Sequence, residues 1–424
     1  MRSRKWPWIP VAVLILSLAL SGCGATAVPT QPPAVATTAP TQAPAPTAPP
    51  AAAFEIPDIE AGKFNIAMVL IGPHNDGGWS QSHFEGLDYV QNNMKDAHTA
   101  YVENVPEGAD SEQVFRSLSR KGFNLIFGTS FGFMDPMEIV AGEFPDIMYV
   151  HISGYKANGT NFGNLFGAME DMKMLAGMLA GSRAKVDGNP KLGYMATFPI
   201  PEELRLGNAF AIGMRKTCPE CTMDVRWINT WHDPIVEKEA AASLFDAGAQ
   251  VVLTGADTPA VADVAQAKGK WGITYDWYGS CKVDHCLTAP YWNWGPIYLK
   301  VAQDVQAGTY KPGWEYFDAE SGGLGLFGFM EGETPQPGIA DLPPEDVQLV
   351  KDTLAQMLAG KFNRFDVFAG PVKDNQGNMV VPAGEKMVQA DLDQFPPGAA
   401  GLECKYCMHW WAEGITAELP KLNP

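Results

Sequence analysis

The chain has 424 residues and a formal net charge of −18 at pH 7. Binding to nucleic acid depends on basic side chains that neutralise phosphates, so this acidic composition argues against a nucleic-acid partner. The body of the chain, from about residue 54 onwards, exceeds the usual size of one hydrophobic core. We therefore expect two lobes.

The first residues are typical of a secretory signal. Arg2, Arg4 and Lys5 precede a short apolar run at residues 11–20, "VAVLILSLAL", which is too short to cross a bilayer as a mature transmembrane helix. The run ends in "LSGC", which resembles the lipobox of bacterial lipoproteins. This predicts a signal peptide over residues 1–22 and lipidation of Cys23. An ordinary signal peptide with a chance cysteine is the alternative.

Residues 24–53 consist mostly of alanine, proline and threonine and carry no charge. Such a segment cannot bury a core, so we expect an extended tether over residues 23–61. Lipid, tether and folded body together predict an extracytoplasmic protein that is anchored to the cell membrane.

From residue 64 the chain alternates apolar runs with amphipathic segments. In the segment 82–94, for example, Phe84, Leu87, Val90 and Met94 fall on one face of a helix. Alternation of strands and helices predicts an α/β fold with two doubly wound lobes of four parallel strands each. The strands are expected at residues 64–71, 99–103, 124–128, 147–152, 191–197, 222–228, 251–255 and 271–276.

Ligands of such sheets bind outside the carboxyl ends of the strands. The loops that follow the expected strands are rich in aromatic residues, which predicts a cleft that stacks on a flat or apolar ligand. These residues are Trp79, Phe131, Phe133, Tyr155, Phe198, Trp231 and Trp277, with Trp292 and Trp294 in a later segment.

Apart from Cys23, the cysteines come in three close pairs, and an even number in an exported chain predicts disulfides. The pairs are Cys218 with Cys221, Cys281 with Cys286, and Cys404 with Cys407. The alternative is a four-thiolate zinc site built from "CPEC" and "CKYC". No cofactor is expected, because the sequence has no phosphate-binding P-loop and no G-x-G-x-x-G after its first strand.

The body resembles the substrate-binding lipoproteins of the basic membrane protein (BMP) family, which serve ABC importers. The similarity rests on "GGWSQSHFEGL", "FPDIMYVHI", "NLFGAMEDMKMLAGMLAG" and "INTWHDPIVEKEAAASLFDAGAQVV", and continues through "ADTPAV", "GITYDW" and "FAGPVKDNQGN". The resemblance implies the type I periplasmic binding protein fold, in which two lobes joined by a hinge close on a ligand. Lobe 1 would comprise residues 62–159 and 287–320, and lobe 2 residues 160–286 and 321–424.

Characterised members of this family bind purine nucleosides, and related ones are thought to bind purine bases. By this resemblance Trp79 would stack on one face of the base, Trp231 on the other, and Asp276 would accept hydrogen bonds from the ligand. Further ligand contacts are expected from a weaker group of candidates: Ser80, Gln81, Tyr275, Trp277, Asn293 and Trp294.

Two departures from the family pattern bear on the ligand. Ser153 stands near the place of an Asp that nucleoside-binding relatives often carry, and "YWNWG" replaces a segment with a Lys. Fewer charged contacts favour a free purine base, with a nucleoside as the second choice.

Other functions stay open at this point. The same cleft would serve a ligand sensor or a sugar-binding protein, since indoles also stack on pyranose faces. "GTSFG" at residues 128–132 matches the G-x-S-x-G elbow of serine hydrolases. Ser130 would then need Asp257 or Asp276 and His285 or His409 as partners. We expect a binding protein without catalytic activity.

Overall fold

The computed structural model describes residues 54–393 and 403–419. The predicted signal peptide, Cys23 and nearly all of the predicted tether lie outside this range. All of the described residues belong to one compact unit. Among these residues, no helix has both the length and the apolar character needed to cross a membrane.

A six-stranded parallel sheet forms the first half of the body, in the order β12-β5-β4-β3-β1-β2. Ile66, Met68 and Leu70 pack into one hydrophobic cluster with helices α1 and α8, while Ala67 and Val69 pack into another with α2 and α3. The alternation follows from the two-residue period of a strand that is covered on both faces. The bounds are β1 Phe64–Leu70, α1 Trp79–Asn93, β2 Ala97–Val102, α2 Ala109–Lys121, β3 Leu125–Thr129, α3 Met134–Glu143, β4 Met148–Ile152, β5 Phe162–Gly167, α8 Trp294–Gln306 and β12 Trp314–Phe317.

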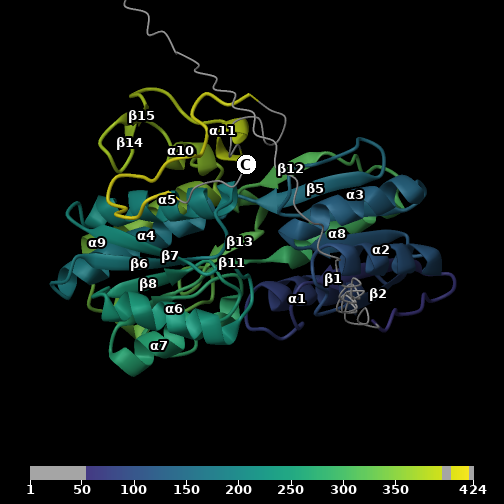
Figure 1. Ribbon diagram of the computed structural model, residues 1–424, viewed down its shortest axis with the longest axis horizontal. Coiled ribbons are helices and arrows are strands. Elements are labelled where there is room, and N and C mark those ends of the chain that lie inside the picture. The colour runs from purple at the N-terminus through teal and green to yellow at the C-terminus, as the bar shows by residue number, and fades with distance from the viewer. Residues whose placement is uncertain (1–53, 394–402, 420–424) are drawn as a thin grey trace, which may run out of the picture. The chain divides into compact units, whose positions relative to one another are not determined.

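A five-stranded parallel sheet forms the second half, in the order β10-β9-β8-β6-β7. Figure 1 shows α4 and α5 on one side of this sheet and α6 and α7 on the other. The bounds are α4 Glu170–Val186, β6 Lys191–Ala196, α5 Pro201–Thr217, β7 Thr222–Trp227, α6 Pro234–Asp246, β8 Val251–Thr254, α7 Ala260–Lys268, β9 Trp271–Ile273 and β10 Cys286–Thr288.

Helices α4 and α5 lie unusually close together because glycines face each other. A Cβ atom added to Gly177 would lie 2.1 Å from the carbonyl oxygen of Phe210, and one added to Gly213 would lie 1.9 Å from that of Met174. The backbones therefore touch, and α4 is buried along almost its whole length.

The C-terminal part packs on this helical layer. Helices α9 Pro344–Leu358, α10 Arg364–Val367 and α11 Gln389–Asp393 contact α4 or α5. Asn208 of α5 holds the last described segment, since its side chain donates to the carbonyl of Trp410 and accepts from the amide of Ala412. Two small antiparallel pairs complete the fold, β11 Pro290–Trp292 with β13 Leu324–Leu326 and β14 Val372–Lys373 with β15 Met379–Val381.

The prediction of four strands in each lobe is wrong. β5 and β12 join the first sheet and β10 joins the second. β5 was not predicted because three of the six residues of "FGNLFG" are Gly or Asn, which are uncommon in strands, so the segment lacks an apolar run. The chain passes from the first sheet to the second after β5 and leaves the second sheet after β10. The predicted lobe boundaries lie at residues 159 and 286. The division into lobes stays a prediction.

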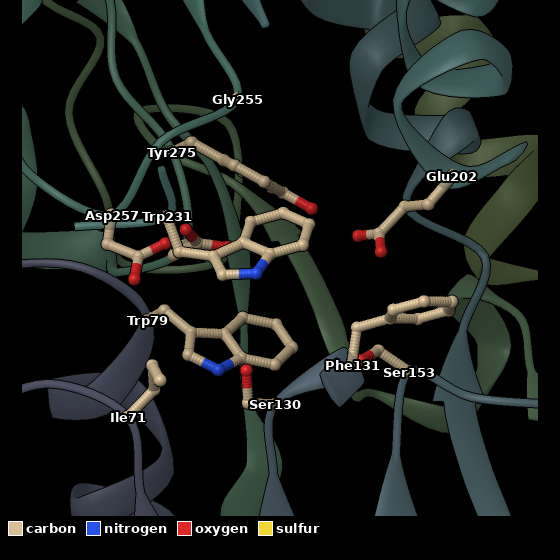
Figure 2. Close-up of a pocket in the computed structure, with 11 residues that line it drawn as sticks. Ile71, Trp79, Ser130, Phe131, Ser153, Glu202, Trp231, Gly255, Asp257 and Tyr275 are labelled. Carbon is tan, nitrogen blue, oxygen red and sulfur yellow. The ribbon is translucent and has the colours of Figure 1, made fainter. Parts of the chain in front are cut away.

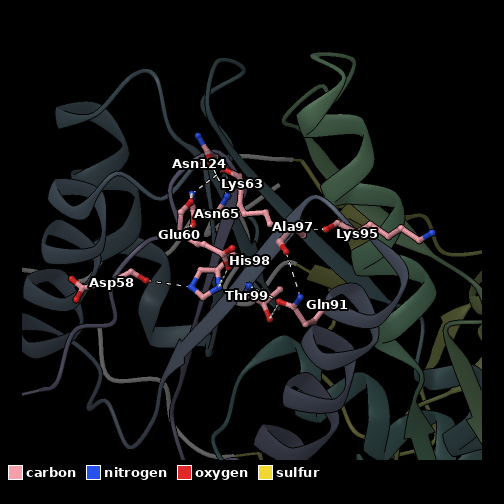
Figure 3. A network of polar contacts seen from close by, with 10 residues as sticks. All are labelled: Asp58, Glu60, Lys63, Asn65, Gln91, Lys95, Ala97, His98, Thr99 and Asn124. Atoms are coloured by element: carbon pink, nitrogen blue, oxygen red, sulfur yellow. Dashed lines mark hydrogen bonds and ion pairs between the residues drawn. The ribbon is translucent and has the colours of Figure 1, made fainter.

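The segment before β1 is fixed to the first sheet by a polar network (Figure 3). The Asn65 side chain accepts a hydrogen bond from the amide of Glu60 at 2.8 Å and donates to its carbonyl at 3.1 Å. The Nε2 atom of His98 on β2 lies 3.2 Å from the carbonyl oxygen of Asp58. These bonds hold the point at which the predicted tether would reach the body.

The cysteines of the body are joined in the three predicted pairs, Cys218–Cys221, Cys281–Cys286 and Cys404–Cys407. The four sulfurs of "CPEC" and "CKYC" therefore do not form a zinc site in this structure.

Candidate ligand-binding site

A small cavity lies at the carboxyl ends of strands from both sheets, and the non-atom space of about 340 Å³ around it includes space open to solvent. The loops after β1, β3 and β4 contribute from the first sheet, and those after β6, β7, β8 and β9 from the second. The lining residues are Ile71, Trp79, Ser130, Phe131, Ser153, Glu202, Trp231, Gly255, Asp257, Tyr275 and Asp276.

Trp79 is fixed on the side of the first sheet. It begins α1, is 8% exposed, and its Nε1 donates a hydrogen bond of 2.6 Å to the carbonyl of Thr129. Its ring meets the rings of His83 and Trp294 edge to face. A tryptophan follows the glycine-rich turn because the turn brings its ring to the cavity while these neighbours bury the rest of it.

Trp231 comes from the loop after β7 on the side of the second sheet. Its ring lies 5.0 Å from that of Phe198, and its carbonyl accepts a hydrogen bond from the amide of Asp257. Figure 2 shows the indoles of Trp79 and Trp231 one above the other, with Phe131 beside them. The two rings that the sequence predicted as a pair thus line the same cavity.

Three carboxyl side chains line the cavity, and none of its lining residues is Lys or Arg. Burial raises the pKa of Glu202 to about 8. Burial likewise raises the pKa of Asp257 and of Asp276 well above their usual range. Asp276 accepts a hydrogen bond of 2.8 Å from Trp292, and both Asp276 and Ser153 have positive φ, at 69° and 76°. Such strained backbone is found mainly at functional sites.

Lys173 lies behind the cavity wall and does not line the cavity. Its Nζ atom lies 3.2 Å from the centre of the Tyr275 ring and donates a hydrogen bond of 3.0 Å to the carbonyl of Thr254. Burial lowers the pKa of Lys173 to about 7, although the charge of Asp276 favours the protonated form.

Loops from the two sheets touch at the edge of the cavity. A Cβ atom added to Gly78, just after β1, would lie 1.7 Å from the carbonyl oxygen of Asp257, just after β8. Trp277 also donates a hydrogen bond of 3.0 Å to Glu85 of α1. The structure therefore shows the closed state of the cleft, in which loops of the two sheets are in contact beside the cavity.

The weaker candidates divide into two groups. Tyr275 lines the cavity, and its buried hydroxyl has no hydrogen-bond partner within the described residues. Five others are not among the residues that line the cavity. Ser80 accepts a hydrogen bond from the amide of Gly72, and Gln81 and Trp277 each donate one to Glu85. Asn293 donates to the carbonyl of Gly322, and the ring of Trp294 stacks on that of Tyr298. Their predicted contact with ligand stays untested.

Glu202 was not selected from the sequence as a site residue, and Asp257 was named only as a possible partner of a hydrolase serine. Both residues follow strands of the second sheet, which is the position at which ligands of such sheets bind. What the sequence could not show is that their side chains turn into one cavity.

The hydrolase alternative lacks its serine–histidine contact. Ser130 Oγ donates a hydrogen bond of 2.6 Å to Glu107. His285 lies elsewhere, stacked on Trp271 with its Nδ1 at 2.6 Å from the carbonyl of Lys270. The imidazole of His151 lies near Ser130, but its Nε2 is 2.7 Å from the Ser130 carbonyl oxygen and its Nδ1 is 3.0 Å from Asn164, so its observed hydrogen bonds go to atoms other than Ser130 Oγ.

One group of side chains has the composition of a metal site. Ligand atoms of Asp76, His232 and Asp257 lie within 4.8 Å of one another, and no other such group occurs within residues 54–393 and 403–419. The Asp76 carboxylate already accepts hydrogen bonds from the amides of Gly78, Ser80 and Gln81. Its observed role is to fix the glycine-rich turn at the start of α1.

Replacing Glu202 with glutamine is expected to flatten the pH dependence of stability. Because the pKa of Glu202 is raised from 4.5 to about 8, its contribution is fully favourable below pH 4.5 and is lost as the pH rises towards 8. Between pH 5 and pH 9 the free energy of unfolding of the wild type should fall by roughly a few kcal/mol more than that of Glu202→Gln. Urea unfolding of both proteins at pH 5, 7 and 9 measures this. A difference independent of pH would contradict it.

Comparison with known proteins identifies the family. A family model described as ABC transporter substrate-binding protein, PnrA-like (Bmp), matches residues 63–337. A Haloferax volcanii protein named for glucose binding, TsgA13, is 34% identical over 344 residues, which cover 81% of this chain and 82% of that protein. A purine-binding protein of Brucella abortus is 32% identical over 364 residues, covering 85% of this chain and 95% of that protein.

Solved structures agree in fold. The solute-binding protein of an ABC transporter system from Aeropyrum pernix K1 superposes with a TM-score of 0.60, at 18% identity, over 73% of this chain and 93% of that chain. One from Conexibacter woesei DSM 14684 superposes with a TM-score of 0.55, at 20% identity, over 70% and 97%. The predicted type I periplasmic binding protein fold is thereby confirmed, and so is the resemblance drawn from the sequence motifs. The chain belongs to the Bmp family of PnrA-like substrate-binding proteins of ABC transporters.

Proposed function

We propose that this protein captures a purine base or a purine nucleoside in the cavity and delivers it to the permease of an ABC importer. The observation that carries the proposal is the pair of indoles, Trp79 and Trp231, which line one cavity from opposite sheets. Stacking of a base on an aromatic side chain is worth about 1–3 kcal/mol. Two such faces make more stacking contact with a flat heterocycle than with a flexible or spherical ligand.

The polar part of the lining supports the same choice. Glu202, Asp257 and Asp276 offer acceptors, and purines carry N–H donors on their edges. The relative from Brucella abortus is named for purine binding. Titration calorimetry with adenine, guanine and adenosine tests the proposal, and absence of heat for all three would refute it.

A sugar is the second candidate, because the Haloferax volcanii relative is named for glucose binding. Sugar hydroxyls both donate and accept, so their sites combine acceptors with donors such as Arg, Asn or Gln. None of these residue types lines this cavity. Glucose in the same calorimetric series separates the two: heat with glucose and none with the purines would favour the sugar.

We propose no chemical conversion of the ligand. Assays with a chromogenic ester are expected to show no turnover above background, and Ser130→Ala is expected to change nothing, since Ser130 Oγ faces Glu107 rather than an imidazole. Turnover that disappears in Ser130→Ala would contradict this. A sensor would use the cleft without delivering its ligand; uptake of labelled purine that depends on this protein would exclude that alternative.

We also propose that lipid on Cys23 holds the protein at the outer face of the cytoplasmic membrane. The lipobox-like "LSGC" and the uncharged segment behind it support this. Cys23→Ala is expected to move the protein from the membrane fraction into the soluble extracytoplasmic fraction, as followed by immunoblotting. Retention of Cys23→Ala in the membrane would count against the anchor.

A further inference from the structure

The acceptors of the cavity are spread around the indole pair rather than gathered at one point. In the view of Figure 2, Asp257 lies on one side of the indoles and Glu202 on the other, beyond the edges of both rings. Asp257 follows β8, and Glu202 lies in the first turn of α5, which follows β6. A flat ligand held between the rings would present one edge to each carboxyl group.

Asp257 has no partner from the protein that would satisfy its side chain. It is 3% exposed, and its buried Oδ2 atom has no hydrogen bond within the described residues. The largest charge effects on it come from four acidic residues, Asp276, Asp76, Glu237 and Glu203, and a ring nitrogen of His232 lies within 4.8 Å of its carboxylate. A buried acceptor in such surroundings requires a donor, and the cavity that it lines is the place from which one can come.

Glu202 is in the same condition. It is 8% exposed, and neither a hydrogen bond nor an ion pair within the described residues occupies its carboxyl group. Arg205 is near enough to act on its charge, but the guanidinium of Arg205 pairs with Asp393 and Glu170 instead. Both carboxyl groups are thus left for the ligand.

We propose that Glu202 and Asp257 form a two-ended clamp for N–H donors, so that the site selects a free purine base with a donor on each of its two rings. This inference rests on the proposed function and narrows it. In a free purine, the imidazole N–H and the donors of the six-membered ring lie on different edges. A nucleoside has lost the imidazole N–H to its glycosidic bond, so one carboxyl group would stay unpaired.

The clamp also sets a charge rule. Urate is an anion at neutral pH and would bring negative charge between three carboxyl groups with no lysine or arginine in the lining. An anion that enters this buried site loses its hydration and finds no cationic partner in the lining, which is unfavourable. The site should therefore accept neutral purines and reject anionic ones.

Calorimetry with four ligands tests the clamp on the wild-type protein. Adenine carries donors on both rings, 9-methyladenine only on the six-membered ring, and unsubstituted purine only on the five-membered ring. Because a buried acceptor left without a donor is unfavourable, each of the last two should bind roughly tenfold to a hundredfold more weakly than adenine. Urate should show no binding. Equal affinity of adenine and 9-methyladenine would overturn the proposal, and so would tight binding of urate.

Two variants assign the ends. Glu202→Gln and Asp257→Asn keep the side-chain shape, and each should shrink the preference for adenine over one of the two analogues by about tenfold while leaving the other preference in place. Glu203→Gln is the matched control, since this neighbouring buried carboxyl group bonds to Tyr194 and Thr197 and does not line the cavity. It should leave both preferences unchanged. Thermal unfolding of each variant checks that the protein is folded.

The possible outcomes distinguish a failure of the two-ended clamp from a failure of the proposed purine binding. If adenine and adenosine bind equally well, the clamp is wrong and the purine function stands. If no purine binds and glucose does, the function itself is wrong. If Glu202→Gln and Asp257→Asn both leave the two preferences intact, other groups recognise the donors and the assignment of these residues fails.

Discussion

Replacing Trp231 with alanine is expected to weaken purine binding by roughly tenfold to a hundredfold, the loss of about 1–3 kcal/mol of stacking on one face of the base. The substitution should have little effect on the stability of the fold, because the Trp231 side chain is partly exposed in a loop and its ring contacts Phe198 rather than the core. Calorimetry gives the affinity, and thermal unfolding without ligand should move little. Unchanged affinity would exclude the pair of stacking rings.

Trp271→Ala provides the matched control for this prediction. Trp271 begins β9 of the same sheet, stacks on His285 and bonds to Asp187, and does not line the cavity. Its removal should lower stability while the purine affinity stays within about twofold. Trp79 is a poorer first target, because it is 8% exposed and its loss would disturb the ring cluster around His83 and Trp294.

Replacing Gly78 with alanine is expected to block closure of the cleft. The added Cβ would lie 1.7 Å from the carbonyl oxygen of Asp257, a distance at which the two loops cannot both stay in place. Overpacking of this kind costs about 1–3 kcal/mol or more, so purine affinity should fall roughly tenfold to a hundredfold or further. Calorimetry measures the affinity, and small-angle scattering with saturating ligand measures whether the protein still becomes more compact.

Gly142→Ala is the control for that substitution. Gly142 lies in α3, and a Cβ atom at this position would meet no heavy atom within 4 Å. The variant should bind purines like the wild type. Gly78→Ala should differ from Gly142→Ala in purine affinity but not in stability without ligand. In the open state the two loops would separate, and the new methyl group would contact no other atom. A large loss of stability without ligand would show that the contact is part of the fold rather than of closure.

The buried acids of the cavity lead us to expect that ligand favours the closed state. Glu202, Asp257 and Asp276 all have raised pKa values caused by burial, so ionising them while the cleft is closed is unfavourable. If the ligand is a purine, as we propose, its N–H donors would offset that cost, and closure around it should be favoured over closure without ligand.

The sequence by itself determined the class of fold and the parts of the chain that carry function. The eight apolar runs and the helices between them predicted parallel α/β sheets, because strands buried on both faces read as continuous apolar stretches. The loops after those strands pointed to a group of aromatic residues that includes Trp79 and Trp231, because ligands of such sheets bind at their carboxyl ends. The family resemblance then selected these two as the stacking pair. Motif order, rather than any single motif, pointed to the family.

Only the tertiary structure decided which of these residues share a cavity. Ser80, Gln81, Trp277, Asn293 and Trp294 were also selected as candidate contacts, yet none of them is among the residues that line the cavity in the structure. Glu202 and Asp257 come from loops far apart in the chain and reach the cavity only because β6 and β8 are neighbours in the sheet. The direction of a side chain depends on contacts between distant segments, and one-dimensional patterns do not contain them.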